Sequence, residues 1–291
     1  MDSNKTVPYE DIGITIDYPT TLRLYNDPTW PIDRPESIRC GRDNMNHASS
    51  TEVLTVQAGD MITFAHQLND PAEWTNAQFL DCPQGRGTCD DQGYTMGLFH
   101  KGPVVAHLSK VPEGQDVHIY DGLGEWIKIY TIGIRTRGPG DFAGLPFIWL
   151  PHNDGKLPPK VSVYALDHKP NFRKAALIHK PQFEFTIPRQ TPSGQYLLRI
   201  DMIWPGTVMK QYNDTLYTQI YPSCAQIRVE SDVVGGSLPK GIRIPEDLSP
   251  TSPGMMVSED MHYGRTMDED FVYPGGLRWD GEELIVDKPV Y

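Results

Sequence analysis

Apolar and polar residues alternate with a period of two in several short segments of the chain. This pattern is typical of β-strands, because successive side chains of a strand point to opposite faces of a sheet. It is clearest in residues 195–204, and in residues 182–187, where Phe183, Phe185 and Ile187 share one face. Further strands are predicted over residues 53–56, 61–66, 103–111, 125–132 and 216–230, the last with a bend at Pro222.

Turn residues separate these predicted strands and leave little room for long helices. The chain contains 26 Gly and 26 Pro, which interrupt helices and form turns. The turn Ala58-Gly59-Asp60 between two of the strands predicts a hairpin. Several short strands with regular turns predict an all-β fold, an antiparallel β-sandwich of the immunoglobulin-like or fibronectin-III-like type with long loops.

One sandwich domain is predicted over residues 1–234. Residues 133–181 are less regular and carry many basic side chains, so we expect them to form a long surface excursion from that domain. Residues 235–291 are rich in Pro and Gly but contain too many large apolar side chains for simple disorder. We expect this C-terminal extension to pack across the sandwich.

Composition and charge exclude several classes of function. The chain of 291 residues is 38% hydrophobic, enough for a real core, and no run of about 18 apolar residues occurs that could span a membrane. The net charge of -12 disfavours binding to a phosphate backbone, so we expect no nucleic-acid partner. We expect a monomer that has no membrane partner.

Cysteines and glycosylation sequons favour a secreted protein. The four cysteines allow three pairings; Cys82 and Cys89 are close enough to close a small loop, which leaves Cys40 with Cys224. Two sequons begin at Asn4 and Asn213, and disulfides together with sequons are typical of extracellular proteins. Residues 1–12 are polar and acidic, unlike a signal peptide, so we expect a truncated start or numbering after processing.

A candidate metal site combines a loop histidine with two residues of a late strand. Gln219 and Tyr221 lie two apart and therefore share a face, whereas Cys224 turns toward the interior. His100 lies between Gly97 and Gly102, in a loop that enters a strand. An imidazole is a good copper ligand, a phenol oxygen suits a weak axial position, and Gln can hydrogen-bond a bound oxygen species. Such a His–Tyr pair in isolation is usually structural.

The surrounding sequence resembles fungal lytic polysaccharide monooxygenases of auxiliary activity family 9, formerly glycoside hydrolase family 61. The resemblance covers roughly residues 12–276 and is specific in its combination of segments. They are residues 38–40, 100–104, 124–129, 185–188, 194–199, 219–227, 240–245, 252–254 and 273–275.

This resemblance implies a set of roles for the candidate residues. His100 would be the in-chain ligand of one copper ion, Tyr221 its axial group and Gln219 the residue that positions oxygen. Cys40 would pair with Cys224. The implied activity is copper-dependent oxidative cleavage of cellulose or a related β-1,4-glucan, with an external electron donor.

The chain departs from the family pattern in three places. The family supplies two of its three nitrogen ligands from an N-terminal His, whereas position one here is Met1, so the activity requires an N-terminal His upstream. A histidine beside the copper ligands usually follows the Leu-Leu-Arg strand, but residues 203–206 read Ile-Trp-Pro-Gly. The 133–181 excursion is also longer than expected.

Other interpretations remain open from the sequence. A non-catalytic relative would bind polysaccharide without copper, and a third alternative is a secreted interaction domain. Asp121 and Glu125 could form a glycosidase acid/base pair, although only their proximity suggests it. Tyr263 and Tyr273 could stack on sugar rings, with core packing the commoner role. The remaining histidines show no ligand spacing.

Overall fold

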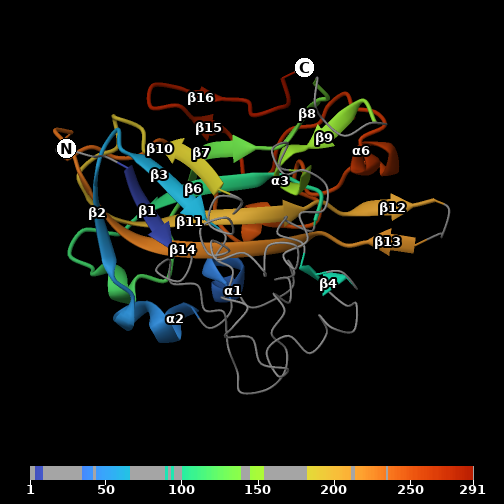
Figure 1. Ribbon diagram of the computed structural model, residues 1–291. Helices are drawn as coiled ribbons and strands as arrows, with labels where there is room; N and C mark the ends of the chain where they lie inside the picture. Colours follow the sequence, from blue (N-terminus) through green and yellow to red (C-terminus); the bar gives the residue numbers. More distant parts are fainter. Residues whose placement is uncertain are drawn as a thin grey trace, which may run out of the picture.

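A computed structural model gives the fold of this chain. It describes residues 4–8, 35–41, 44–65, 89–90, 93–94, 100–138, 145–153, 182–210, 214–233 and 235–290. In these residues two sheets face each other, and short helices and the C-terminal segment lie around them (Figure 1). The predicted β-sandwich is confirmed.

The larger sheet has seven strands in the order β16-β15-β7-β6-β11-β14-β2. Its members are β2 (Val53–Gln57), β6 (Val104–Lys110), β7 (Ile127–Ile132), β11 (Gly194–Trp204), β14 (Gln219–Glu230), β15 (Arg278–Trp279) and β16 (Leu284–Ile285). The central pairs of the sheet, β7–β6, β6–β11 and β11–β14, are antiparallel as predicted. The added strands β2 and β15 pair in parallel.

The smaller sheet has the order β1-β3-β10. It consists of β1 (Asn4–Pro8), β3 (Met61–Ala65) and β10 (Gln182–Thr186). Three two-stranded ribbons accompany the sheets: β4 (Cys89–Asp90) with β5 (Gly93–Tyr94), β8 (Ile134–Thr136) with β9 (Phe147–Trp149), and β12 (Thr207–Met209) with β13 (Asp214–Leu216). The β12–β13 ribbon projects from one end of the large sheet (Figure 1).

All helices in the described part of the chain are short, as the Gly and Pro content predicts. They are α1 (Pro35–Cys40), α2 (Asn44–His47), α3 (Leu150–Asn153) and α6 (Glu259–Tyr263), with 3-10 turns η2 (Ala48–Ser50), η4 (Val117–Ile119) and η5 (Glu246–Leu248). Helix α6 begins after Ser258, whose side chain accepts a hydrogen bond from the amide of Met261, and ends at Gly264 in the left-handed conformation.

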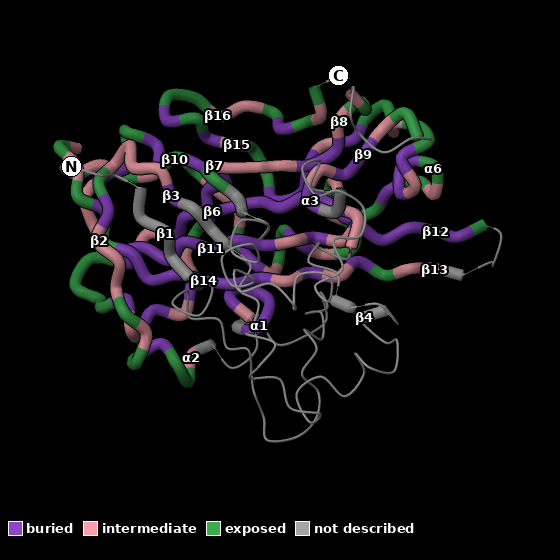
Figure 2. Tube along the Cα trace, viewed as in Figure 1, coloured by how far each residue is buried: buried purple, intermediate pink, exposed green. Residues whose placement is uncertain are grey.

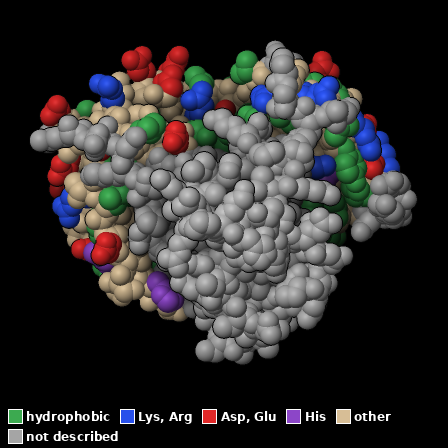
Figure 3. Space-filling view, in the orientation of Figure 1, with side chains coloured by type: hydrophobic (Ala, Val, Ile, Leu, Met, Phe, Trp, Pro, Cys, Tyr) green, Lys and Arg blue, Asp and Glu red, His purple; other side chains and the backbone are tan. Residues whose placement is uncertain are grey.

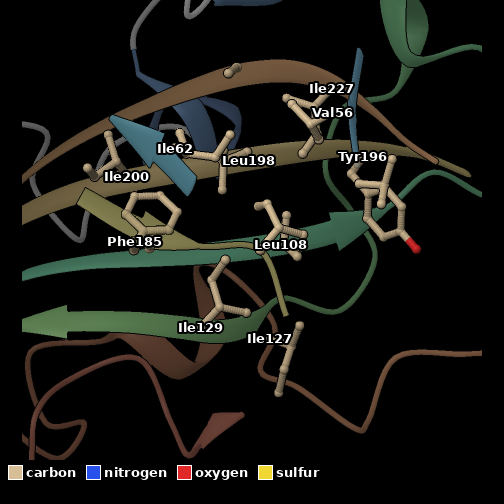
Figure 4. Close-up of a cluster of buried hydrophobic side chains, with 14 of the residues drawn as sticks. Val56, Ile62, Leu108, Ile127, Ile129, Phe185, Tyr196, Leu198, Ile200 and Ile227 are labelled. Atoms are coloured by element: carbon tan, nitrogen blue, oxygen red, sulfur yellow. The ribbon is translucent and has the colours of Figure 1, made fainter. Parts of the chain in front are cut away.

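The main core lies between the two sheets (Figure 4). The alternation predicted for residues 195–204 holds there, because Tyr196, Leu198 and Ile200 all point into this core. Phe185 and Ile187 of the smaller sheet meet them, as predicted, whereas the side chain of Phe183 is outside the described residues. Full burial of each such side chain contributes roughly 1.5–3 kcal/mol, so this interface dominates the stability of the sandwich.

The opposite face of the large sheet is buried as well. Strand β6 is buried along nearly its whole length, and β11 and β14 are buried through their central residues (Figure 2). A second core forms on this face beneath α1 and η5, with members from distant parts of the chain: Ile38, Val105, Trp126, Leu197, Ile220, Ile244, Leu248 and Met255. On β11, the polar residues Arg199 and Asp201 that alternate with the main-core residues are therefore buried as well.

The predicted hairpin at residues 58–60 is wrong. Strand β2 pairs with β14 in the large sheet, whereas β3 pairs with β1 and β10 in the small sheet. The turn is instead an arch between sheets, because the amide of Ala58 donates to Glu230 and that of Gly59 to Ile187. Val56 and Ile62 consequently reach the main core from opposite sides.

The disulfide between Cys40 and Cys224 is confirmed, and it joins α1 to β14 across 184 residues of sequence. The predicted Cys82–Cys89 pair involves Cys82, which is outside the described residues. Asn213 also lies outside them, and Asn4 is described only as backbone of β1.

The C-terminal segment adds strands and side chains to the sandwich. Strand β15 pairs with β7, and Trp126 forms a bridge with Ile242. Lys128, fully buried on β7, pairs with Asp287 over 2.8 Å. The described parts of residues 133–181, which are 133–138 and 145–153, join a third core with this segment. Its members are Ile134, Trp149, Val257, Met261, Phe271 and Tyr273.

The visible face in Figure 3 carries acidic and basic side chains along its rim. Lys and Arg gather toward the side where β8, β9 and α6 lie. Among the helices of the described residues, none is long and apolar enough to cross a membrane.

Candidate metal centre

The candidate site lies at the end of the large sheet from which β12 and β13 project. Strand β14 begins there with Gln219, and Tyr221 follows on the same face. The Tyr221 hydroxyl donates a hydrogen bond to Oε1 of Gln219 over 2.6 Å, and both side chains are half-buried. Across the sheet, Trp204 of β11 is the register partner of Gln219.

His100 lies against this end of the sheet. Its imidazole stacks on Trp204 with a centroid distance of 4.1 Å and an interplanar angle of 15°. It also stacks on Tyr221 with a centroid distance of 5.3 Å and an angle of 25°. The structure therefore brings together the sequence-predicted residues His100, Gln219 and Tyr221.

Glycine allows the His100 loop to approach β11 closely. A Cβ atom at Gly102 would lie 1.8 Å from the carbonyl oxygen of Ile203, so a larger residue would push the loop away. The amide of Ile203 donates to the carbonyl of Pro103 over 3.0 Å, which continues the pairing of β6 and β11 up to the loop. This backbone contact sets where His100 sits.

Further rings continue from Trp204 toward helix α6. The Trp204 ring stacks on His262 at 6.1 Å, and His262 meets Tyr263 edge-on at 5.1 Å. Lys101 and Arg265 both lie over the Tyr263 ring, at 4.7 and 4.6 Å from its centroid. Burial lowers the pKa of Lys101, and the charge of Arg265 lowers it further.

Sequence reasoning missed Trp204 and His262 as neighbours of the site. His262 was grouped with scattered histidines because nothing local connects α6 to His100. The lack of a histidine in residues 203–206 was the available signal for a different neighbour at this site. The structure places the Trp204 ring against His100.

Beneath the site, an acidic side chain binds the backbone of Tyr221. Asp201 is fully buried on β11, and its Oδ1 accepts a hydrogen bond from the amide of Tyr221 over 2.8 Å. Burial raises the pKa of Asp201, while the adjacent Arg199 guanidinium opposes the rise.

The donor types at the site suit copper, but the described residues supply only part of a ligand set. Stacking covers faces of the His100 ring and not its edge, where the nitrogen lone pairs lie. A phenol oxygen and an amide accompany that imidazole. No group of three or more His, Cys, Asp or Glu side chains that could hold a metal occurs within the described ranges. The described residues thus present one imidazole and one phenol oxygen, donor types that copper accepts, and a complete copper site would need further nitrogen ligands.

The other candidates have structural partners. Tyr273 is buried and its hydroxyl binds the backbone of Ile134, so it does not stack on sugars. Asp121 contacts Arg39, and Glu125 accepts a hydrogen bond from the amide of Gly241, which gives each carboxylate a role in anchoring distant segments.

Two further histidines are also held by neighbours. His118 binds Asp116. His107 is fully buried, and its Nε2 donates to the carbonyl of Gly275 over 3.0 Å. Burial holds the pKa of His107 well below its usual range, assisted by the charge of Arg199.

Fold and site together define a β-sandwich with a His, Gln and Tyr cluster at one end of its large sheet. The sequence model of Auxiliary Activity family 9 (formerly GH61) matches residues 14–267. The chain belongs to this family.

Curated relatives agree with the assignment. The chain is 28% identical over 272 residues to AA9 family lytic polysaccharide monooxygenase U of Thermothielavioides terrestris, covering 91% of this chain and 80% of that protein. It is 24% identical over 245 residues to AA9 family lytic polysaccharide monooxygenase C of Emericella nidulans, covering 84% of this chain and 75% of that protein. At the level of the family, the chain is thereby placed among polysaccharide monooxygenases, which are secreted copper enzymes.

Solved structures share the fold. The crystal structure of HiLPMO9B aligns with a TM-score of 0.53 at 19% identity, covering 95% of this chain and 93% of that chain. The extended catalytic domain of H. jecorina LPMO9A aligns with a TM-score of 0.53 at 18% identity, covering 96% and 88% of the two chains. At such identity the likeness concerns the fold.

Proposed function

We propose that this chain is a copper-dependent lytic polysaccharide monooxygenase that cleaves cellulose or a related β-1,4-glucan by oxidation. The observation that carries this proposal is the position of His100, stacked on Trp204 and on Tyr221, with Tyr221 hydrogen-bonded to Gln219. His100 lies more than 100 positions before Gln219 and Tyr221, which share strand β14, and the three side chains meet at one end of the sandwich.

Each residue has a separate task in this proposal. His100 donates a ring nitrogen to the metal, and stacking fixes the plane of that ring. Tyr221 would offer its phenol oxygen to the metal, and Gln219 would orient that phenol through the hydrogen bond between their side chains. Copper, when bound, supplies the one-electron redox chemistry, with electrons from an external donor. The proposal requires further nitrogen ligands, which the family pattern assigns to an N-terminal His.

The secreted, monomeric character of the enzyme belongs to the same proposal. Glycans at Asn4 and Asn213 and a second disulfide between Cys82 and Cys89 would suit an extracellular protein. We also propose that residues 1–234 form the catalytic-type domain and that residues 235–291 form its extension.

Copper binding and product analysis test the proposal. Secreted, mature protein is titrated with Cu²⁺ and then incubated with cellulose and a reductant, and His100→Ala is compared with His118→Ala. The matched control removes a histidine held by Asp116 outside the site. We expect His100→Ala to abolish oxidised oligosaccharides and weaken copper binding, while His118→Ala behaves as wild type. Equal activity in both variants would contradict the role of His100.

A non-catalytic family member is the second candidate, because residues 203–206 read Ile-Trp-Pro-Gly where the family usually has a histidine. In that case the protein would bind cellulose equally well with and without a chelator and form no oxidised products. Retention on cellulose in EDTA, together with no copper binding by the mature protein, would support this candidate over the enzyme.

A further inference from the structure

The large sheet contains an ion pair that is completely removed from solvent. Arg199 and Asp201 lie two residues apart on β11, both side chains are 0% exposed, and Nη2 of Arg199 lies 2.6 Å from Oδ2 of Asp201. Buried ion pairs seldom stabilise a fold more than apolar side chains of the same volume would. Their contacts with the rest of the molecule therefore indicate what this pair does.

On one side the pair binds the helix that carries the disulfide. Nε of Arg199 donates to the carbonyl of Arg39 over 2.7 Å, and Nη2 donates to that of Ile38 over 3.3 Å. Both carbonyls belong to α1, immediately before Cys40, which is bonded to Cys224. Arg199 is thus fixed by the end of α1.

On the other side the pair binds the strand of the candidate metal site. Oδ1 of Asp201 accepts the amide hydrogen of Tyr221, and Oδ2 faces Arg199. The next residue, Pro222, is the register partner of Asp201 and has no amide hydrogen. Pro222 therefore cannot donate to β11, and the Asp201 carboxylate accepts the amide hydrogen of the preceding residue, Tyr221.

The residue that follows α1, Gly41, lies close to the backbone of Pro222. Gly41 has φ 93°, and a Cβ atom on it would lie 3.0 Å from the carbonyl oxygen of Pro222. The backbone of residues 221–222 consequently lies between Asp201 and the end of α1. A chain of contacts then runs from Arg39 through Arg199 and Asp201 to Tyr221, whose ring stacks on His100.

We propose that Arg199 and Asp201 are positioning residues that hold Tyr221 against His100. The pair acts through the Tyr221 backbone and touches neither the metal nor the polysaccharide. The inference rests on the proposed function, in which Tyr221 is the axial group. Loss of the pair would leave a folded sandwich in which the Tyr221 ring no longer keeps its stacked position.

The test measures the His100–Tyr221 contact in metal-free protein by nuclear magnetic resonance. The double variant Arg199→Met/Asp201→Leu replaces the pair with apolar side chains and leaves no lone buried charge. The matched control is Lys128→Met/Asp287→Leu, which removes another buried ion pair, between Lys128 of β7 and Asp287 of the C-terminal segment. Circular dichroism establishes that each protein is folded.

We expect the Arg199/Asp201 double variant to lose the nuclear Overhauser contact between the ring protons of His100 and Tyr221 and to shift the His100 resonances. The control should keep both signals, even where its melting temperature falls. Unchanged His100 signals in the folded double variant would overturn the proposal, as would an equal loss in the control.

A milder substitution keeps the test decisive if the double variant does not fold. Asp201→Asn retains an oxygen for the Tyr221 amide but loses the charge that Arg199 binds. Faster hydrogen exchange of that amide and a weaker ring contact than in the control support the proposal, and wild-type values for both overturn it. Failure of the wild-type protein to bind copper would remove the proposed function alone, because these readouts need no metal.

Discussion

The hydroxyl of Tyr221 and the side-chain oxygen of Gln219 are joined by a hydrogen bond of 2.6 Å at the start of β14. Both residues lie on one face of the strand, and the Tyr221 ring rests against His100. The phenol hydroxyl is therefore oriented by Gln219 from within the same strand. The ring is held by His100, which lies more than 100 positions earlier in the sequence.

Removal of that hydroxyl should separate the structural and chemical roles of Tyr221. Tyr221→Phe keeps the stacked ring but loses one partly exposed hydrogen bond, so we expect a loss of stability of only about 1 kcal/mol. Copper affinity should change little, because an axial phenol is a weak ligand. The yield of oxidised oligosaccharide should fall. Thermal melts, copper titration and product analysis check these three results, and loss of copper binding would contradict the axial assignment.

The stack between Trp204 and His100 should matter more for the metal than for the fold. Trp204→Ala removes the face that fixes the imidazole plane, whereas Trp204→Phe keeps an aromatic surface. Stacked pairs contribute about 0.5–1.5 kcal/mol, so we expect copper affinity to fall up to about tenfold in the Ala variant. Calorimetric titration of both variants measures this, and equal affinities would show that stacking does not orient His100.

The disulfide should make a large contribution to stability. Cys40 and Cys224 close a loop with a sequence separation of 184. In the chain-entropy account such long loops correspond to about 4–5 kcal/mol. The variant Cys40→Ala/Cys224→Ala should therefore melt well below wild type in calorimetry. A melting temperature within a degree of wild type would show that the packing of α1 alone holds that end of the sheet.

Acid should destabilise the protein through His107. Burial keeps the folded-state pKa of His107 well below 6.5, so the unfolded chain binds a proton that the folded chain does not. The free energy of unfolding therefore carries no penalty from His107 above about pH 6.5. As the pH falls from there toward the folded-state pKa, the free energy of unfolding decreases by up to about 1.4 kcal/mol per pH unit. Denaturant titrations between pH 7 and 5 should show this slope in wild type and a smaller one in His107→Gln. Equal slopes in the two proteins would contradict the assignment of this pH dependence to His107.

Local patterns in the sequence predicted the main strands, whereas cysteine spacing and the family resemblance predicted the Cys40–Cys224 disulfide. The period-two alternation of residues 195–204 corresponds to β11, since Tyr196, Leu198 and Ile200 all enter the main core. The same alternation did not reveal that Arg199 and Asp201 are buried, because the second core comes from α1 and the C-terminal segment. Burial on both faces depends on distant segments that no local period encodes.

The hairpin failed as a prediction for a related reason. A short turn between two strands is compatible with pairing or with an arch, and only the partners of Val56 and Ile62 in opposite sheets decide between them. At the site, the family resemblance indicated His100, Gln219 and Tyr221. It did not indicate Trp204, because that position departs from the family pattern.

The most direct test of the central claim is copper titration of the mature protein from its native source, with its N-terminal residue determined on the same sample. The account predicts an N-terminal His and tight binding of one Cu²⁺ per chain, lost in His100→Ala. Another residue at the N-terminus, with no tight copper binding, would contradict the monooxygenase and favour carbohydrate binding without catalysis.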